Sequence, residues 1–170
     1  MIQRKQSIYL FLAAALLSIT YFVPLSTFIG EKDSLVLYLY HVESLVPGFS
    51  SPFTSFFILP LIIPVTLIVI ISLVTIFLYK NRKLQLILVR FMLLLLLIYL
   101  GVYFFYYIEA LETQSGGYAS YQYSVPILET GIQIPTVIFI IPLVSAMLFF
   151  MAARGITNDE KLVRSTDRLR

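Results

Sequence analysis

The chain has 170 residues, of which 59% are hydrophobic and only 12% are charged, and its mean hydropathy is +0.93. A soluble domain carries about 25% charged residues, so this composition cannot build a water-facing surface and indicates one compact integral membrane domain. The absence of cysteine excludes thiol redox chemistry, a lipoprotein anchor and cysteine–zinc sites. The net charge of +3 is typical of the excess of Lys and Arg that membrane proteins carry on their cytoplasmic side.

The first apolar segment covers residues 8–23 and follows Arg4 and Lys5. Basic residues ahead of an apolar run are also typical of a secretory signal. This run is long for a signal, however, and it continues through Tyr21-Phe22-Val23-Pro24, which makes a poor cleavage site. We interpret it as an uncleaved first transmembrane helix, with a signal peptide as the alternative.

Two polar segments, residues 24–52 and 108–131, separate the apolar runs. In the first, Leu35–Tyr40 is rich in β-forming residues and too short to span a bilayer, which predicts a strand or an interfacial segment. In the second, Gly116-Gly117 predicts a turn, and Tyr121–Val125 alternates polar and apolar residues as a strand does. We predict that these two strands form a short β-pairing between the loops.

Three further apolar segments, residues 53–79, 84–107 and 134–153, are each long enough to cross a bilayer. With the first segment they predict an all-α fold, a single domain over residues 1–170 that forms an antiparallel bundle of four transmembrane helices and ends in a tail, residues 154–170. Proline lies in the second span at Pro60 and Pro64 and in the fourth at Pro135 and Pro142, which predicts kinks.

Four spans with the short turn Lys80-Asn81-Arg82-Lys83 between the middle two require an antiparallel bundle, in which both chain termini lie on the same side of the membrane as this turn. Eleven of the twelve Lys and Arg residues fall in the N-terminal segment, in this turn and the adjoining helix, and in the tail, whereas six of the nine acidic residues fall in the two loops. The positive-inside rule therefore predicts cytoplasmic termini.

The tail has its own pattern of charges. Thr157 and Glu160 fit a capping box, and Glu160 with Arg164 forms a favourable i,i+4 pair. One interpretation is a solvated helix that extends the fourth span and contacts anionic headgroups; the other is a docking peptide for a protein partner. No aromatic residues interleave with the arginines, so we expect no nucleic acid partner. The candidate partner-binding residues are Lys80, Arg82, Lys83, Asp159, Glu160, Leu162, Arg164, Asp167, Arg168 and Arg170.

Arg90 lies seven residues past Lys83, and it either snorkels to the cytoplasmic interface or pairs with a polar group inside the bundle. His41 is the single histidine and lies in a loop, so the chain has neither a metal-ligand spacing nor a catalytic triad. We expect no enzymatic activity, no cofactor and no metal site. The expected function is that of an accessory or scaffold subunit; the alternative is a small-molecule or lipid transporter that uses the proline-containing second and fourth spans.

Three stretches carry a resemblance to a known family: Met1–Arg4, Ile76–Gln85 across the turn, and Asp159–Arg170 in the tail. Together they resemble family 4293 of the domains of unknown function, small four-helix inner-membrane proteins of Bacteroidetes-type bacteria. The resemblance spans the chain from end to end. It implies a bacterial inner membrane and no activity, substrate or partner, and it implies that the turn and the tail are the characteristic parts of the family.

Overall fold

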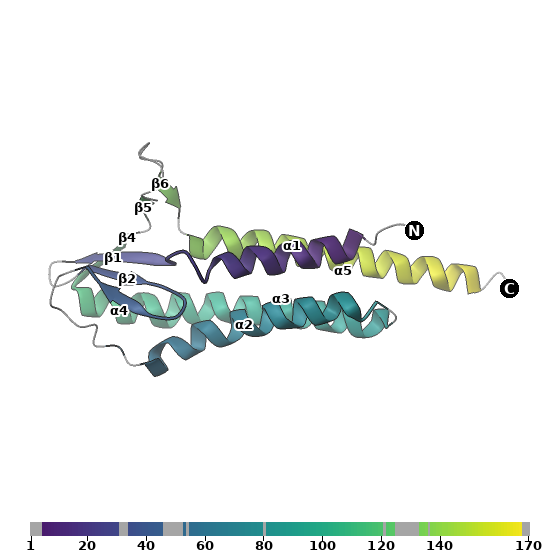
Figure 1. The fold of residues 1–170 in the computed structure, drawn as a ribbon, viewed down its shortest axis with the longest axis horizontal. Helices are drawn as coiled ribbons and strands as arrows, with labels where there is room; N and C mark the ends of the chain where they lie inside the picture. Colours follow the sequence, from purple (N-terminus) through teal and green to yellow (C-terminus); the bar gives the residue numbers. More distant parts are fainter. Residues whose placement is uncertain are drawn as a thin grey trace.

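Four long helices lie side by side, and a small β-sheet packs against one end of them (Figure 1). The structure is a computed structural model that describes residues 5–30, 34–45, 53, 55–79, 81–120, 122–124, 133–135 and 137–167, with the backbone alone for residues 29–30, 55, 117–120, 122–124, 133–135, 137–139 and 161–167. The long helices are α1 (Lys5–Ile19), α2 (Ser55–Phe77), α3 (Arg82–Val102) and α5 (Val137–Asp167).

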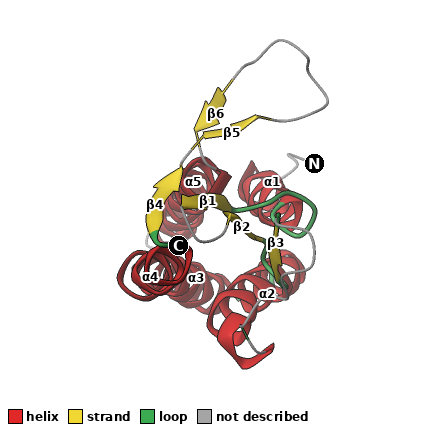
Figure 2. Ribbon diagram, turned by 90° about the vertical axis from the view of Figure 1, so that its left-hand side faces the viewer, coloured by secondary structure: helices red, strands yellow, loops and turns green. Residues whose placement is uncertain are grey.

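The helices are arranged so that α1 and α3 each contact both α2 and α5. Viewed along the helices, α2 and α5 therefore lie diagonally opposite each other (Figure 2). The buried residues of α1 and α5 include the small residues Ala13, Ala14 and Ala152, and small side chains let helix backbones approach closely. The two chain termini and the α2–α3 turn lie at one end of the molecule and the strands lie at the other (Figure 1).

Among the described residues, three helical segments are long and apolar enough to cross a membrane: Phe56–Phe77, Arg82–Ser115 and Ile140–Glu160. Large apolar side chains point outward along them, among them Leu97 and Leu143, which are 69% and 66% exposed. A continuous apolar exterior of this kind is unfavourable in water and favourable in lipid. The chain is therefore built as a membrane protein.

The first helix is shorter than predicted. It has 15 residues, or about 22 Å at 1.5 Å per residue, against about 30 Å for the hydrocarbon core of a bilayer. The prediction of a helix through residue 23 is wrong at its end, because a turn follows Ile19 and leads through Pro24 into the sheet.

The third helix is longer than predicted. Beyond Val102 it passes without a break into a π-helical turn, η1 (Tyr103–Tyr107), and then into α4 (Ile108–Ser115). Residues 108–115, predicted as part of a polar loop, are thus helical. The helix ends at Gly116, whose φ of 67° is the left-handed conformation that glycine adopts most easily, so the predicted turn is confirmed there.

The fourth helix, α5, runs unbroken from Val137 to Asp167 and confirms that the tail extends the fourth span. The predicted start at residue 134 is wrong, because Gln133–Pro135 forms strand β6. Proline therefore lies inside a helix at Pro60, Pro64 and Pro142. The predicted capping box is also wrong, since Thr157 lies within α5 and its hydroxyl donates to the Ala153 carbonyl oxygen at 2.8 Å.

The larger sheet has the strand order β3-β2-β1-β4, with β1 (Ser26–Gly30), β2 (Ser34–Leu37), β3 (Val42–Ser44) and β4 (Gly117–Ser120). A separate pair joins β5 (Gln122–Ser124) to β6. The two loops are therefore linked by an antiparallel pairing, as predicted, but the pairing joins β1 to β4. The predicted partners are wrong: β2 pairs with β1 and β3, and β5 pairs with β6.

Two apolar clusters fill the interior. At the sheet end, strand residues such as Phe28 and Leu37 pack on Leu61 of α2 and on Tyr103 of η1. At the other end, α1, α2, α3 and α5 pack on one another around Leu10 and Phe149, among others. The sheet packs on the bundle beyond the C-terminal end of α1 (Figure 1). The second cluster therefore lies nearer the end of the molecule that holds the chain termini.

Candidate functional site

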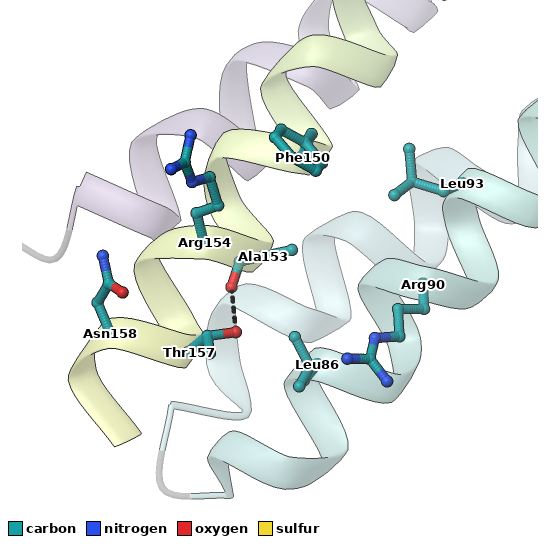
Figure 3. Close-up of a pocket in the computed structure, with 8 residues that line it drawn as sticks. All are labelled: Leu86, Arg90, Leu93, Phe150, Ala153, Arg154, Thr157 and Asn158. Atoms are coloured by element: carbon teal, nitrogen blue, oxygen red, sulfur yellow. Dashed lines mark hydrogen bonds between the residues drawn. The ribbon is translucent and has the colours of Figure 1, made fainter. Parts of the chain in front are cut away.

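A pocket lies between α3 and α5 near the end that holds the chain termini, and its volume is about 460 Å³. Figure 3 shows its two walls, one from each helix. The wall from α3 consists of Leu86, Arg90 and Leu93, which follow one another at intervals of three or four residues and therefore share a helix face. The wall from α5 consists of Phe150, Ala153, Arg154, Thr157 and Asn158.

Arg90 and Arg154 give the pocket its charge. Both side chains are exposed, and neither forms an ion pair with any side chain that the structure describes. The Arg154 guanidinium lies 5.9 Å from the centre of the Phe150 ring, at the outer limit of a cation–π contact. Of the two interpretations of Arg90, its exposed position on α3 favours snorkelling over pairing inside the bundle.

Both arginines lie at the border of the apolar exterior. On α3, Ile87, Phe91 and Leu94 are exposed around Arg90, and on α5 the exposed apolar residues Met147, Phe150 and Met151 precede Arg154. Charged residues at such a border reach the headgroup region of a bilayer while their stems remain in the apolar layer. The pocket therefore lies where the apolar exterior of the two helices meets their charged ends.

Asp159 joins three segments of the chain close to this pocket. The Arg82 guanidinium donates to the Asp159 carbonyl oxygen at 2.7 Å, and the Gln6 amide donates to the Asp159 carboxylate. The first contact fixes the α2–α3 turn against α5, and the second fixes the start of α1 against the same helical turn. Gln6 is itself buried. The predicted residues Arg82 and Asp159 are therefore brought together by the fold.

The other predicted residues differ in their surroundings. Lys83 is exposed, and Glu160 is half-buried on α5. Asn81 begins α3, and its side-chain oxygen accepts the Leu84 backbone N–H at 3.2 Å, which satisfies one of the unpaired donors of the first helical turn. Lys80, Arg168 and Arg170 lie outside the described residues, and for Leu162, Arg164 and Asp167 the backbone alone is described.

Sequence reasoning missed the pocket and the role of Gln6. Arg90 and Arg154 belong to helices that are adjacent in space and far apart in the chain, so no local motif unites them. One signal was present: each arginine lies in or directly after an apolar run, near the end of that run that is close to the chain termini and the α2–α3 turn. When α3 and α5 pack side by side, these two arginines come to lie at the same level along the helices and line one pocket.

A transport path would need polar groups inside the bundle, and most of the hydroxyl groups described in α2 and α5 form hydrogen bonds within the structure, whereas that of Ser145 is buried without a partner. Ser72 donates to the Leu10 carbonyl oxygen of α1 at 2.8 Å, and Thr75 donates to the Ile71 carbonyl oxygen of its own helix at 2.6 Å. The pocket described above lies between α3 and α5, not between the diagonal helices α2 and α5 on which that alternative depends. Transport stays a prediction.

In the loops, His41 lies 3.9 Å from a Glu43 carboxylate oxygen and stacks on Tyr38. Within the described residues there is no group of three or more His, Cys, Asp or Glu side chains placed to hold a metal ion.

The fold and the pocket define the class: a helical membrane protein with a basic site at one end. The chain belongs to the family described as "Domain of unknown function (DUF4293)", whose model matches residues 2–169. No curated protein and no solved structure matches the chain.

Proposed function

We propose that the chain is a four-span protein of a bacterial inner membrane with both termini in the cytoplasm. We further propose that it serves as a non-enzymatic accessory or scaffold subunit whose α2–α3 turn and C-terminal helix bind a protein partner. The observation that carries the proposal is the course of α5, which continues past the start of α1 and past the α2–α3 turn (Figure 1).

The orientation follows from how charge is distributed over the fold. Lys5, Arg82 and Lys83 belong to the end with the termini, whereas Glu43, Glu109 and Glu112 belong to the sheet and α4 at the other end. Since Lys and Arg are retained on the cytoplasmic side, the end with the termini faces the cytoplasm.

The docking function follows from the support that the projecting helix receives. Arg82 holds the turn against Asp159, so the base of the projection is fixed while the helix beyond Glu160 extends away from the bundle. An isolated helix of this length is marginal in water, and it gains stability by packing against another surface. The mixed charges and the two leucines of the sequence 161–170, Leu162 and Leu169, match a protein surface better than a uniformly basic segment would.

A photo-cross-linking residue at each of three positions tests the docking. Leu162 lies in the tail, Lys83 is exposed in the first turn of α3, and Leu97 on α3, 69% exposed, is the lipid-facing control. We expect the same protein adduct from Leu162 and Lys83 and no such adduct from Leu97. Truncation after Glu160, which keeps Asp159, should abolish the Lys83 adduct. If truncation leaves that adduct unchanged, or if Leu97 gives it as well, the docking proposal is wrong.

A further inference from the structure

We propose that the groove between α3 and α5 binds the headgroup of an anionic phospholipid, with Arg90 and Arg154 as the phosphate-binding residues. This inference rests on the proposed placement of the basic end at the cytoplasmic surface, and it goes beyond docking of a protein partner. The ligand class is a phosphodiester lipid with a hydroxyl-bearing headgroup, of which phosphatidylglycerol is the simplest probe.

The charge of the groove selects an anion. Arg90 and Arg154 stand on opposite walls (Figure 3), and within the described residues no carboxylate neutralises either of them. A guanidinium presents several N–H donors in one plane and is the preferred partner of phosphate oxygens. In Figure 3 the Arg90 guanidinium lies beside Leu86 and the Arg154 guanidinium is directed away from α3, so the Arg154 side chain would turn toward the groove to meet an anionic headgroup there.

The apolar lining selects a lipid over a soluble phosphate. Leu86, Leu93, Phe150 and Ala153 form much of the groove, and they would gain nothing from a small hydrated anion. The groove is also continuous with the exposed apolar surface of both helices, where Leu94 and Met147 are 53% and 62% exposed. Acyl chains can therefore lie along that surface while the phosphate stays at the arginines. A basic pocket between membrane helices on the cytoplasmic side is a recognised site for such headgroups.

The remaining polar groups match hydroxyls on the headgroup. The Thr157 hydroxyl donates a hydrogen bond to the Ala153 carbonyl oxygen, so the hydroxyl oxygen can still accept a hydrogen bond from a ligand. The Asn158 side chain is exposed at the rim of the groove and can both donate and accept. The volume of about 460 Å³ lies in the range of about 300–1,000 Å³ that is typical of small-molecule sites, which suits a headgroup with the start of its chains.

Lipid binding can be measured on the purified full-length protein in a neutral detergent, by native mass spectrometry with short-chain phosphatidylglycerol. Arg90→Gln and Arg154→Gln should each weaken binding about fivefold, and the double variant about twenty-five-fold, because each basic residue contributes comparably near an anionic surface. Lys5→Gln is the matched control: it removes the same charge from the same end of the molecule but does not line the groove. It should leave the affinity unchanged.

A second variant tests the groove itself. Ala153→Leu fills part of the space between the walls without a change in charge, so it should also weaken phosphatidylglycerol binding. Thermal unfolding of each variant shows whether it is folded; if the double arginine variant is not, the single variants and Ala153→Leu decide the question.

Three results would overturn the proposal: equal binding of phosphatidylcholine, binding of inorganic phosphate with the affinity of the lipid, or a loss in Lys5→Gln equal to that in the arginine variants. The truncation after Glu160 keeps every residue of the groove and should bind lipid normally. Failure of partner docking and failure of lipid binding are therefore distinguishable.

Discussion

Gly155 sets how closely α1 approaches α5 at the basic end. A Cβ atom at this position would lie 3.2 Å from the Gln6 side-chain Cγ, closer than ordinary packing allows. Gln6 in turn donates to the Asp159 carboxylate. A single missing side chain thus lets the start of α1 reach the helical turn that also holds Arg82.

Replacing Gly155 with valine should therefore separate α1 from α5 and break the Gln6–Asp159 hydrogen bond. We expect the free energy of unfolding to fall by about 1–3 kcal/mol, the usual cost of overpacking a tight contact. Denaturant titration in detergent, followed by circular dichroism, measures this change. Gly101→Val is the matched control, because nothing lies within 4 Å of a Cβ at Gly101, and it should change stability by less than about 0.5 kcal/mol. Equal losses at both positions would contradict the argument.

Among the elements, the larger sheet is what ties the two loops together. Thr27 of β1 pairs with Ser120 of β4 on one side and with Val36 of β2 on the other. Strand β1 is thus central, and its backbone hydrogen bonds link a loop that follows α1 to a strand that follows α4. The far end of the bundle is closed by this pairing as well as by side-chain packing.

The pairing can be tested with disulfides, because the chain contains no cysteine of its own. Residues paired across antiparallel strands have Cα atoms about 4.5–5.5 Å apart, within the reach of a disulfide. Thr27→Cys with Ser120→Cys should therefore cross-link under mild oxidation. Val36→Cys with Ser120→Cys should not, since two strand spacings separate them by about 9.6 Å, beyond the limit of about 7 Å. Cross-linking of the second pair alone would mean that the strand order is different.

The π-helical turn η1 reconciles two spacings of buried residues along one helix. Up to Tyr99 the buried positions alternate at intervals of four and three, and beyond it they recur every four residues through Tyr103, Tyr107, Leu111 and Ser115. Each four-residue step overshoots an α-helical turn by about 40°, so the buried stripe would drift around an ideal helix. The wider turn at Tyr103–Tyr107 absorbs part of this drift and keeps Leu111 against the sheet.

Deleting Phe105 should convert this turn into ordinary α-helix, because a π-helical turn holds one residue more than an α-helical turn. Phe105 is 84% exposed, so the deletion itself removes no buried contact. Leu111 should then keep its place against the sheet, and stability should change by less than about 0.5 kcal/mol. Phe105→Ala keeps the chain length and should also be close to neutral. A deletion variant that loses about 2–5 kcal/mol, the cost of displacing a large buried side chain such as Leu111, would show that η1 has no such role.

For the whole molecule, separation of charge between the two ends is the main determinant of orientation. Single cysteines placed in the cysteine-free chain report each end directly. With a membrane-impermeant maleimide, Thr113→Cys on α4 should be labelled in intact spheroplasts, and Lys83→Cys should be labelled only after the membrane is permeabilised. Both side chains are exposed, so differences in burial do not account for the result. The reverse pattern would place the termini outside.

Much of this architecture could be predicted from the sequence. The segments 53–79 and 84–107 are long and uniformly apolar, and such length leaves helices as the simplest way to satisfy their backbone groups in lipid. The four-residue turn then brings α2 and α3 together without any further information. The continuation of α5 into the tail was likewise predictable, because residues 154–167 contain no proline and only one glycine, Gly155.

The partners of the strands and the site between helices could not be predicted. Ser26–Gly30 has no strict alternation of polar and apolar residues. It forms a strand because the Phe28 side chain is buried in the apolar cluster and because β2 and β4 pair with the two edges of β1. The end of α1 at Ile19 depends on the same sheet. For the pocket, Arg90 and Arg154 each resembled an ordinary interfacial residue until the fold placed their helices side by side.

The brevity of α1 implies an uneven footprint in the bilayer. Its outward residues, such as Phe11, face lipid over about 22 Å, whereas α2 presents an apolar surface of about 33 Å. In the proposed four-span arrangement, lipids beside α1 would draw in toward the turn at Thr20–Val23, so the membrane would be thinner there than beside α2. A mismatch of this size costs fractions of a kcal/mol per Å and can sort a protein among membranes. We therefore expect the protein to favour bilayers of short-chain lipids, and to gather such lipids around its first helix.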